Sequence, residues 1–222
     1  MNIETKISSS TVGQYGIVTR FFANLFSFIF HPLLINSYIV AFFIFFHSSV
    51  FTGFDHRTMM FRFITVFLFT SVFPVFAVFL CWRLKLIKSI YLHTSRDRII
   101  PYILVMFFYW WTFYVFNNLP DSPSVVKHLL LGSFLAVCGG WICNIYFKIS
   151  MHAIAMGGLV IFFLLFVFND NYASGLYLSI ALLVAGAVCT ARFIVSDHRP
   201  AEIYAGLVVG SLAQLIGWIF PL

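Results

Sequence analysis

Charged residues are scarce in this chain of 222 residues: they make up 9% of it, and only seven are acidic. Ordinary soluble domains carry about a quarter charged residues. Hydrophobic residues reach 62%, thirty residues are Phe, and the mean hydropathy is +0.99. This composition excludes a soluble globular domain. It predicts an all-α protein that crosses a membrane several times.

Cysteine is also rare, and no stretch rich in Pro, Gly and Ser divides the chain. The four cysteines lack zinc-ligand partners at the usual spacing and are interpreted as small packing residues. We expect a polar N-terminal tail over residues 1–20 and a transmembrane domain over residues 21–222. The tail differs from a secretory signal peptide, because its apolar stretch begins too far from Met1.

Seven apolar stretches approach the length of a membrane-spanning helix. They lie at residues 22–47, 61–82, 99–117, 125–147, 152–169, 173–192 and 201–220. The last three are rich in small residues, which predicts that these three helices pack tightly together, with the Phe-rich early helices around them. Within the first stretch, Pro32 predicts a kink. His31 beside it is a functional candidate, because it lies inside a span.

Polar residues gather in three clusters between these stretches. The first follows the second stretch, the second follows the fourth, and the third follows the sixth. Two spans therefore separate each cluster from the next, which predicts that all three lie on the same face of the membrane. Their members are Arg96, Asp97 and Arg98; Lys148, Ser150 and His152; and Arg192, His198 and Glu202.

These side chains suit phosphate chemistry. Arginine and lysine neutralise phosphate oxygens, and histidines serve as nucleophile or general acid. Glu202 follows His198 by four residues and falls on the same helix face, where it accepts the Nδ1 proton and orients Nε2. Pro200 suits the first turn of a helix, with Ser196 or Asp197 as its cap. His198 would then stand at a helix N-terminus, where anions bind readily.

Residues 96–206 resemble the type 2 phosphatidic acid phosphatase superfamily of membrane phosphatases. Ala191-Arg192-x5-His198-x3-Glu202 is similar to the family signature Ser-Arg-x5-His-x3-Asp, and Ser150 and His152 match half of Pro-Ser-Gly-His. The chain departs from the family at Ala191 and Glu202, and it lacks the signature Lys-x6-Arg-Pro as written. The resemblance implies a six-helix core, so either the first of the seven stretches is an extra N-terminal helix or one stretch does not span.

The resemblance also implies a reaction without metal or cofactor: hydrolysis of a lipid phosphomonoester or a prenyl (pyro)phosphate. His198 would attack phosphorus to form a phosphohistidine, with its ring oriented by Glu202. His152 would protonate the departing alcohol and then activate water. The phosphoryl oxygens would be held by Arg96, Arg98, Lys148, Ser150 and Arg192.

Two alternatives remain open from the sequence. A lipid phosphotransferase would use the same phosphohistidine and pass the phosphoryl group to a lipid alcohol. A catalytically inactive relative would bind or transport lipid. The oligomeric state is not specified by the sequence.

The net charge of +6 comes from basic residues in loops between apolar stretches. Such residues meet lipid headgroups, and no nucleic-acid-binding module is present. More of them lie on the face of the three clusters than on the opposite face, which predicts a cytoplasmic site. We expect a multi-pass protein of a bacterial inner membrane whose partners are membrane lipids and a lipid phosphate.

Overall fold

A computed structural model describes residues 15–87, 98–171, 173–195 and 198–222. Within these ranges the regular structure is helical and contains no strand. The helices are α2 (Ile17–Ile29), η1 (Pro32–Leu34), α3 (Ile35–Phe46), η2 (Ser48–Phe51), α4 (His56–Phe67), η3 (Leu68–Val72), α5 (Phe73–Arg83), α6 (Ile99–Asn118), α7 (Ser124–Tyr146), α8 (Met151–Asn169), α9 (Gly175–Val195) and α10 (Pro200–Ile219).

Seven segments of the described chain are long and apolar enough to cross a membrane. They agree with the seven predicted stretches to within about five residues at each end, so the all-α transmembrane prediction is confirmed. Helix α2 begins at Ile17 and therefore includes the last residues of the predicted tail. The spans are Ile17–Phe46, His56–Arg83, Ile99–Asn118, Ser124–Tyr146, Met151–Asn169, Gly175–Val195 and Pro200–Ile219.

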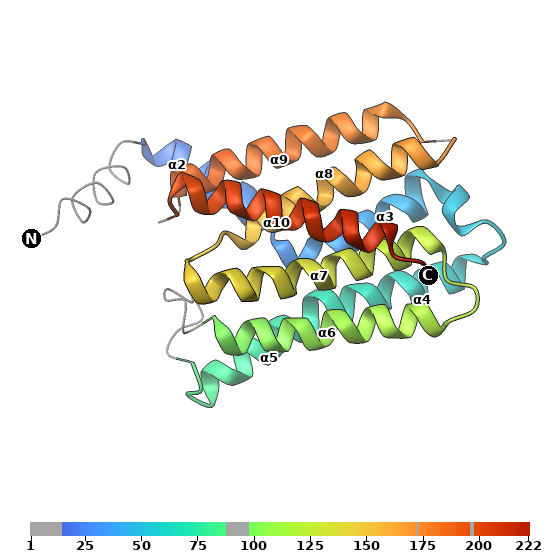
Figure 1. Cartoon of the computed structure of the whole chain (residues 1–222), viewed down its shortest axis with the longest axis horizontal. Coiled ribbons are helices and arrows are strands. Elements are labelled where there is room, and N and C mark those ends of the chain that lie inside the picture. Colours follow the sequence, from blue (N-terminus) through green and yellow to red (C-terminus); the bar gives the residue numbers. More distant parts are fainter. Residues whose placement is uncertain (1–14, 88–97, 172, 196–197) are drawn as a thin grey trace, which may run out of the picture.

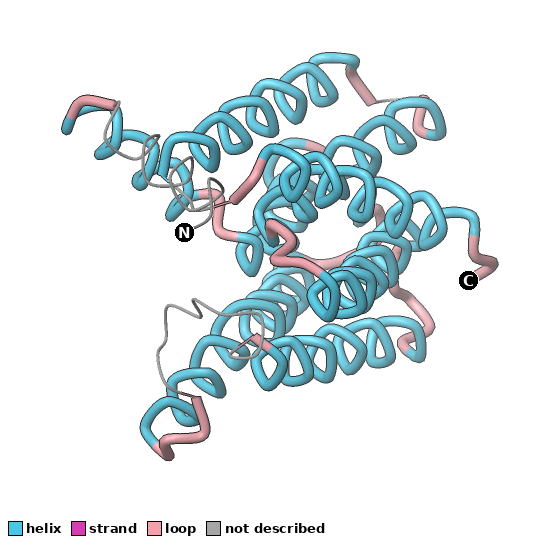
Figure 2. The backbone as a smooth tube through the Cα atoms, turned by 60° about the vertical axis from the view of Figure 1, so that its left-hand side comes forward, coloured by secondary structure: helices cyan, strands magenta, loops and turns pink. Residues whose placement is uncertain are grey.

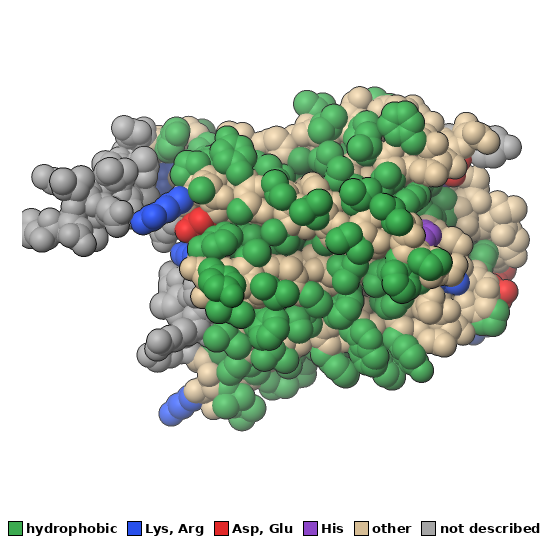
Figure 3. Space-filling model, viewed as in Figure 1, with side chains coloured by type: hydrophobic (Ala, Val, Ile, Leu, Met, Phe, Trp, Pro, Cys, Tyr) green, Lys and Arg blue, Asp and Glu red, His purple; other side chains and the backbone are tan. Residues whose placement is uncertain are grey.

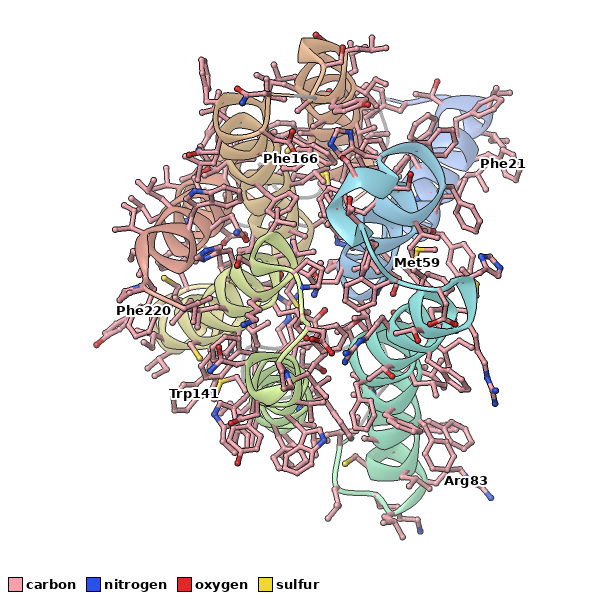
Figure 4. The ribbon with its side chains drawn as sticks, turned by 90° about the vertical axis from the view of Figure 1, so that its right-hand side faces the viewer. Phe21, Met59, Arg83, Trp141, Phe166 and Phe220 are labelled. Carbon is pink, nitrogen blue, oxygen red and sulfur yellow. The ribbon has the colours of Figure 1, made fainter. Side chains whose placement is uncertain are left out.

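The spans run side by side along the long axis of the molecule (Figure 1), and the tube view shows the same bundle from another side (Figure 2). Apolar side chains cover the middle of the bundle, while most charged side chains lie at its two ends (Figure 3). Phe21 of α2 is 63% exposed at the periphery, whereas Phe166 of α8 is buried in the interior (Figure 4). This distribution suits a bundle surrounded by lipid.

The first span is broken in the middle, as Pro32 predicts. Helix α2 ends at Ile29, and the chain resumes in the short helix η1 before α3 begins. The Nδ1 atom of His31 accepts a hydrogen bond from the backbone N–H of Leu33 at 3.4 Å. The carbonyl of Leu33 accepts a hydrogen bond from the hydroxyl of Ser71 at 2.7 Å. A hydroxyl of the second span thus donates to a backbone carbonyl that the break leaves outside a regular α-helix.

The second span contains a distortion that the sequence analysis did not foresee. Residues Leu68–Val72 form a π-helical turn between α4 and α5, just before Pro74. Proline has no backbone N–H and disrupts the regular hydrogen-bond ladder in the preceding turn. The turn brings Ser71 against the break in the first span, where its Oγ also lies 3.3 Å from that of Ser37.

Small residues draw α8 and α10 together, with their backbones in direct contact. A Cβ atom on Gly206 would lie 2.8 Å from the carbonyl oxygen of Ser150. One on Gly210 would clash with the carbonyl of Ile154. The predicted tight packing of the last three helices is nevertheless wrong in one respect: α10 packs mainly on α8 and α7 and barely touches α9. Helix α9 packs on α8 and α2 instead, so its small residues do not contribute to a three-helix cluster.

Candidate active site

His198 lies two residues before the first turn of α10, with its imidazole held by two acceptors. Its Nδ1 atom is 2.9 Å from Oε2 of Glu202 and 3.1 Å from the carbonyl oxygen of Lys148. Both partners accept hydrogen bonds, so Nδ1 carries the proton of the neutral ring and Nε2 keeps its lone pair. The side chain of His198 is 4% exposed, and that of Glu202 is 16% exposed.

Glu202 also fixes the start of α10. Its Oε2 atom accepts a second hydrogen bond, at 3.1 Å, from the backbone N–H of Arg199, which is the N-cap residue. Ser196 and Asp197, the predicted caps, lie outside the described residues, and the position of Arg199 shows that the cap prediction was wrong. The sequence suggested a capping side chain before the helix, but the carboxylate that accepts from the N-cap N–H belongs to Glu202, inside the helix. Pro200 does occupy the first turn, as predicted.

The loop between α7 and α8 connects the three polar clusters. A guanidinium nitrogen of Arg98 donates to the carbonyl of Ile149 at 3.1 Å. The backbone N–H of Ser150 donates to the carbonyl of Glu202 at 3.3 Å. Together with the contact from His198 to Lys148, these bonds bring residues about a hundred positions apart to one end of the bundle, on the left in Figure 1.

The helices α6, α8 and α10 all begin at this end of the bundle. Their N-cap residues are Arg98, Ser150 and Arg199. A helix N-terminus carries a partial positive charge and unsatisfied N–H groups, which favour bound anions. The backbone therefore adds positive potential to that of the basic side chains.

Arg192 and His152 complete the group. Arg192 lies in the last turn of α9, and its charge acts on the rings of both His152 and His198. The Nε2 atom of His152 lies 3.0 Å from the carbonyl oxygen of Ser27 in α2. Since a carbonyl only accepts, Nε2 carries the proton, and Nδ1 is left to exchange protons with a substrate.

A third imidazole lies beside this pair. The rings of His31 and His152 meet edge to face, with centroids 5.6 Å apart, and the charge of Arg192 also acts on His31. The kink interpretation of His31-Pro32 is confirmed, and the same break brings His31 to the candidate site. Its presence inside an apolar span was the signal that marked it. The carbonyl of Ser27 was missed, because a backbone acceptor has no residue signature.

The remaining predicted residues differ in their surroundings. Arg96 lies outside the described residues. Ser150 is 0% exposed, and its hydroxyl caps α8 by accepting from Ala153 N at 3.5 Å. Lys148 takes part through its backbone carbonyl. Among the tyrosines that flank the clusters, Tyr102 is buried, whereas Tyr146 and Tyr204 are 81% and 59% exposed.

Burial and neighbouring cations keep the ring of His198 neutral. Burial has the largest effect and lowers the pKa of His198 from its ordinary value of 6.5, and the charges of Arg98 and Arg192 lower it further. The hydrogen bond to Glu202 acts in the opposite direction and raises the pKa. A neutral imidazole with a lone pair on Nε2 is the form that a nucleophile requires.

No family model, curated protein or solved structure matches the chain.

Proposed function

We propose that the protein is a membrane lipid phosphate phosphatase that works through a phosphohistidine on His198. The observation that carries this proposal is the pair of acceptors on Nδ1 of His198, which leaves Nε2 as a nucleophile beside Arg98 and Arg192. Apolar surface surrounds the bundle up to this end, so a substrate with its tail in the bilayer would present its headgroup here. The resemblance of residues 96–206 to the type 2 phosphatidic acid phosphatases supports the same chemistry.

In the proposed reaction, Nε2 of His198 attacks phosphorus and the bond from phosphorus to the ester oxygen breaks. Nδ1 of His152 takes the proton of the bound phosphate monoester and passes it to the departing alcohol. It then takes a proton from a water molecule, whose oxygen attacks the phosphohistidine and releases inorganic phosphate. Glu202 stabilises the imidazolium that forms on His198, and the basic side chains offset the charge of the phosphoryl oxygens.

The alternatives differ in what they require of His198. A phosphotransferase needs the same nucleophile, with a lipid alcohol in place of water. An inactive lipid-binding relative would not need the oriented ring, so the contacts of His198 favour a competent site over it. The exposed basic residues Arg83, Lys85 and Arg199 support a cytoplasmic position for this end of the bundle.

The test is phosphate release by the purified protein from a panel of lipid phosphates: phosphatidic acid, phosphatidylglycerol phosphate, prenyl mono- and diphosphates and lipid A. A chelator is present throughout, and we expect turnover of at least one substrate without loss of rate. Phosphate release that requires an added lipid alcohol would favour the transferase. Absence of turnover, together with absence of vanadate binding, would contradict the proposal.

The pH dependence gives a second prediction. Because the pKa of His198 is lowered, kcat/KM is expected to persist below pH 6.5, the ordinary histidine value. Glu202→Gln removes the charge that raises this pKa, so the acidic limb should move to still lower pH, while the maximal rate falls about a hundredfold.

Arg199→Gln is the matched control, because it changes one charge on an exposed neighbouring side chain. It should leave the limb in place. An acidic limb that moves to higher pH in Glu202→Gln would contradict the assigned role of the carboxylate.

A further inference from the structure

A cavity of about 70 Å³ lies inside the bundle, next to the candidate active site. Its walls come from η1, α3, α6, α7, α8 and α10. Nothing in the phosphoryl-transfer chemistry described above uses it.

One end of the cavity is lined by residues that adjoin the candidate site in the chain, and the cavity continues toward the middle of the bundle. Near the site it is lined by Pro32, which follows His31, and by Met151, which precedes His152. Along α6 its lining runs from Tyr102 to Tyr109. Seven residues of α-helix span about 10 Å, so the cavity reaches well into the hydrocarbon depth of a membrane.

Tyr102 marks the end of the cavity near the phosphate site. It lies one turn after Arg98 and is 1% exposed. Its phenolic oxygen has no hydrogen-bond partner among the described residues. A buried polar group in this state costs free energy, which a ligand oxygen at the mouth of the cavity would recover. Tyr102 therefore suits the junction between a phosphate and an apolar chain.

Three other polar side chains along the cavity have partners in the protein. Asn36 accepts a hydrogen bond from Ser133 at 2.7 Å, and Gln214 donates to the carbonyl of His128 at 3.2 Å. The rest of the lining is largely aliphatic, with residues such as Ile39, Val105, Leu129 and Leu159. An apolar ligand thus fits the deeper part of the cavity.

We propose that this cavity binds one hydrocarbon chain of a lipid phosphate whose phosphoryl group lies at His198. The inference rests on the proposed function and adds a tail-binding site to it. The chain lies between α6, α7 and α8, and its ester oxygen accepts a hydrogen bond from Tyr102. Recognition of the substrate then depends on chain length up to the depth of the cavity.

A series of butyl, octyl and hexadecyl phosphate tests the proposal. For the unchanged protein, kcat/KM and calorimetric affinity should rise about a hundredfold from butyl to octyl, since each buried methylene contributes about 0.8 kcal/mol. Gly158 lines the deep part of the cavity, and a Cβ atom there meets only the carbonyl of Gly210, at 3.7 Å. Gly158→Leu should therefore lower both values about tenfold or more for octyl and hexadecyl phosphate but leave butyl phosphate unchanged.

Gly186→Leu is the matched control, because a Cβ atom on Gly186 in α9 meets nothing within 4 Å. Its chain-length profile includes any effect of substrate partition into detergent, while its cavity stays unfilled. Ala136→Leu enters the cavity from α7 and replaces Gly158→Leu if the latter loses activity on butyl phosphate. Equal chain-length profiles for the cavity variants and Gly186→Leu would overturn the tail site. The unchanged protein could bind the phosphates in a length-dependent way but turn none of them over. If Gly158→Leu then abolishes the length dependence, the tail site is supported and only the phosphatase proposal is contradicted.

Discussion

Replacing His198 with alanine is expected to reduce phosphate release to background, a loss of at least about ten-thousand-fold. Among the described histidines, only His198 has both an Nδ1 held by a carboxylate and two arginine charges acting on its ring. No phosphohistidine can form without it. The measurement is the initial rate on the best lipid phosphate, together with acid-quench trapping of an acid-labile phosphoryl group on the protein.

His56→Ala is the control for this variant, because His56 is an exposed histidine in the first turn of α4, away from the clusters. It should keep the full rate and the trapped phosphoryl group. Thermal unfolding of both variants shows whether the loss is chemical. A folded His198→Ala protein that turns over at the normal rate would rule out His198 as the nucleophile.

Gly210→Ala is expected to destabilise the bundle by about 1–3 kcal/mol, the usual range for overpacking. The new methyl group would meet the carbonyl of Ile154 and would lie 3.0 Å from the backbone nitrogen of Gly158. Neither is a flexible side chain, so α8 and α10 must separate. Because Ser150 and Glu202 bridge these same helices, activity should fall along with the midpoint of thermal unfolding in detergent.

Gly186→Ala provides the matched comparison within a neighbouring span. Its new methyl group meets nothing within 4 Å, and alanine has a higher helix propensity than glycine by about 1 kcal/mol. The unfolding midpoint should stay unchanged or rise. Equal midpoints for Gly210→Ala and Gly186→Ala would show that the close approach of α8 and α10 does not contribute to stability.

The sequence predicted the spans well because the hydrocarbon core imposes a minimum length on each apolar run. The break at Pro32 followed from the missing N–H of proline. The neighbours of α10 did not follow, because glycine and alanine occur on α8, α9 and α10 alike and do not specify which helices meet. The π-helical turn before Pro74 was missed, although it rests on the same property of proline, because several local geometries can accommodate that residue.

The candidate site was predictable where its chemistry depends on a short spacing along the chain. His198 and Glu202 are four residues apart, and the predicted hydrogen bond between them is present, although His198 lies just before α10 and not on its face. The acceptors on Lys148, Ile149 and Ser27 are backbone carbonyls, which every residue possesses. Which carbonyls accept these hydrogen bonds depends on how distant helices pack, and no pattern in a single sequence predicts that packing.

The contact between His152 and Ser27 has a consequence for biogenesis. One imidazole is held by the Ile17–Phe46 span, and the other immediately precedes the Pro200–Ile219 span. A nascent chain in which the Pro200–Ile219 span has not yet been made therefore has no complete site. The proposed activity would begin only after α10 is in place, so a copy without it could not act on the lipids of the membrane that is receiving it.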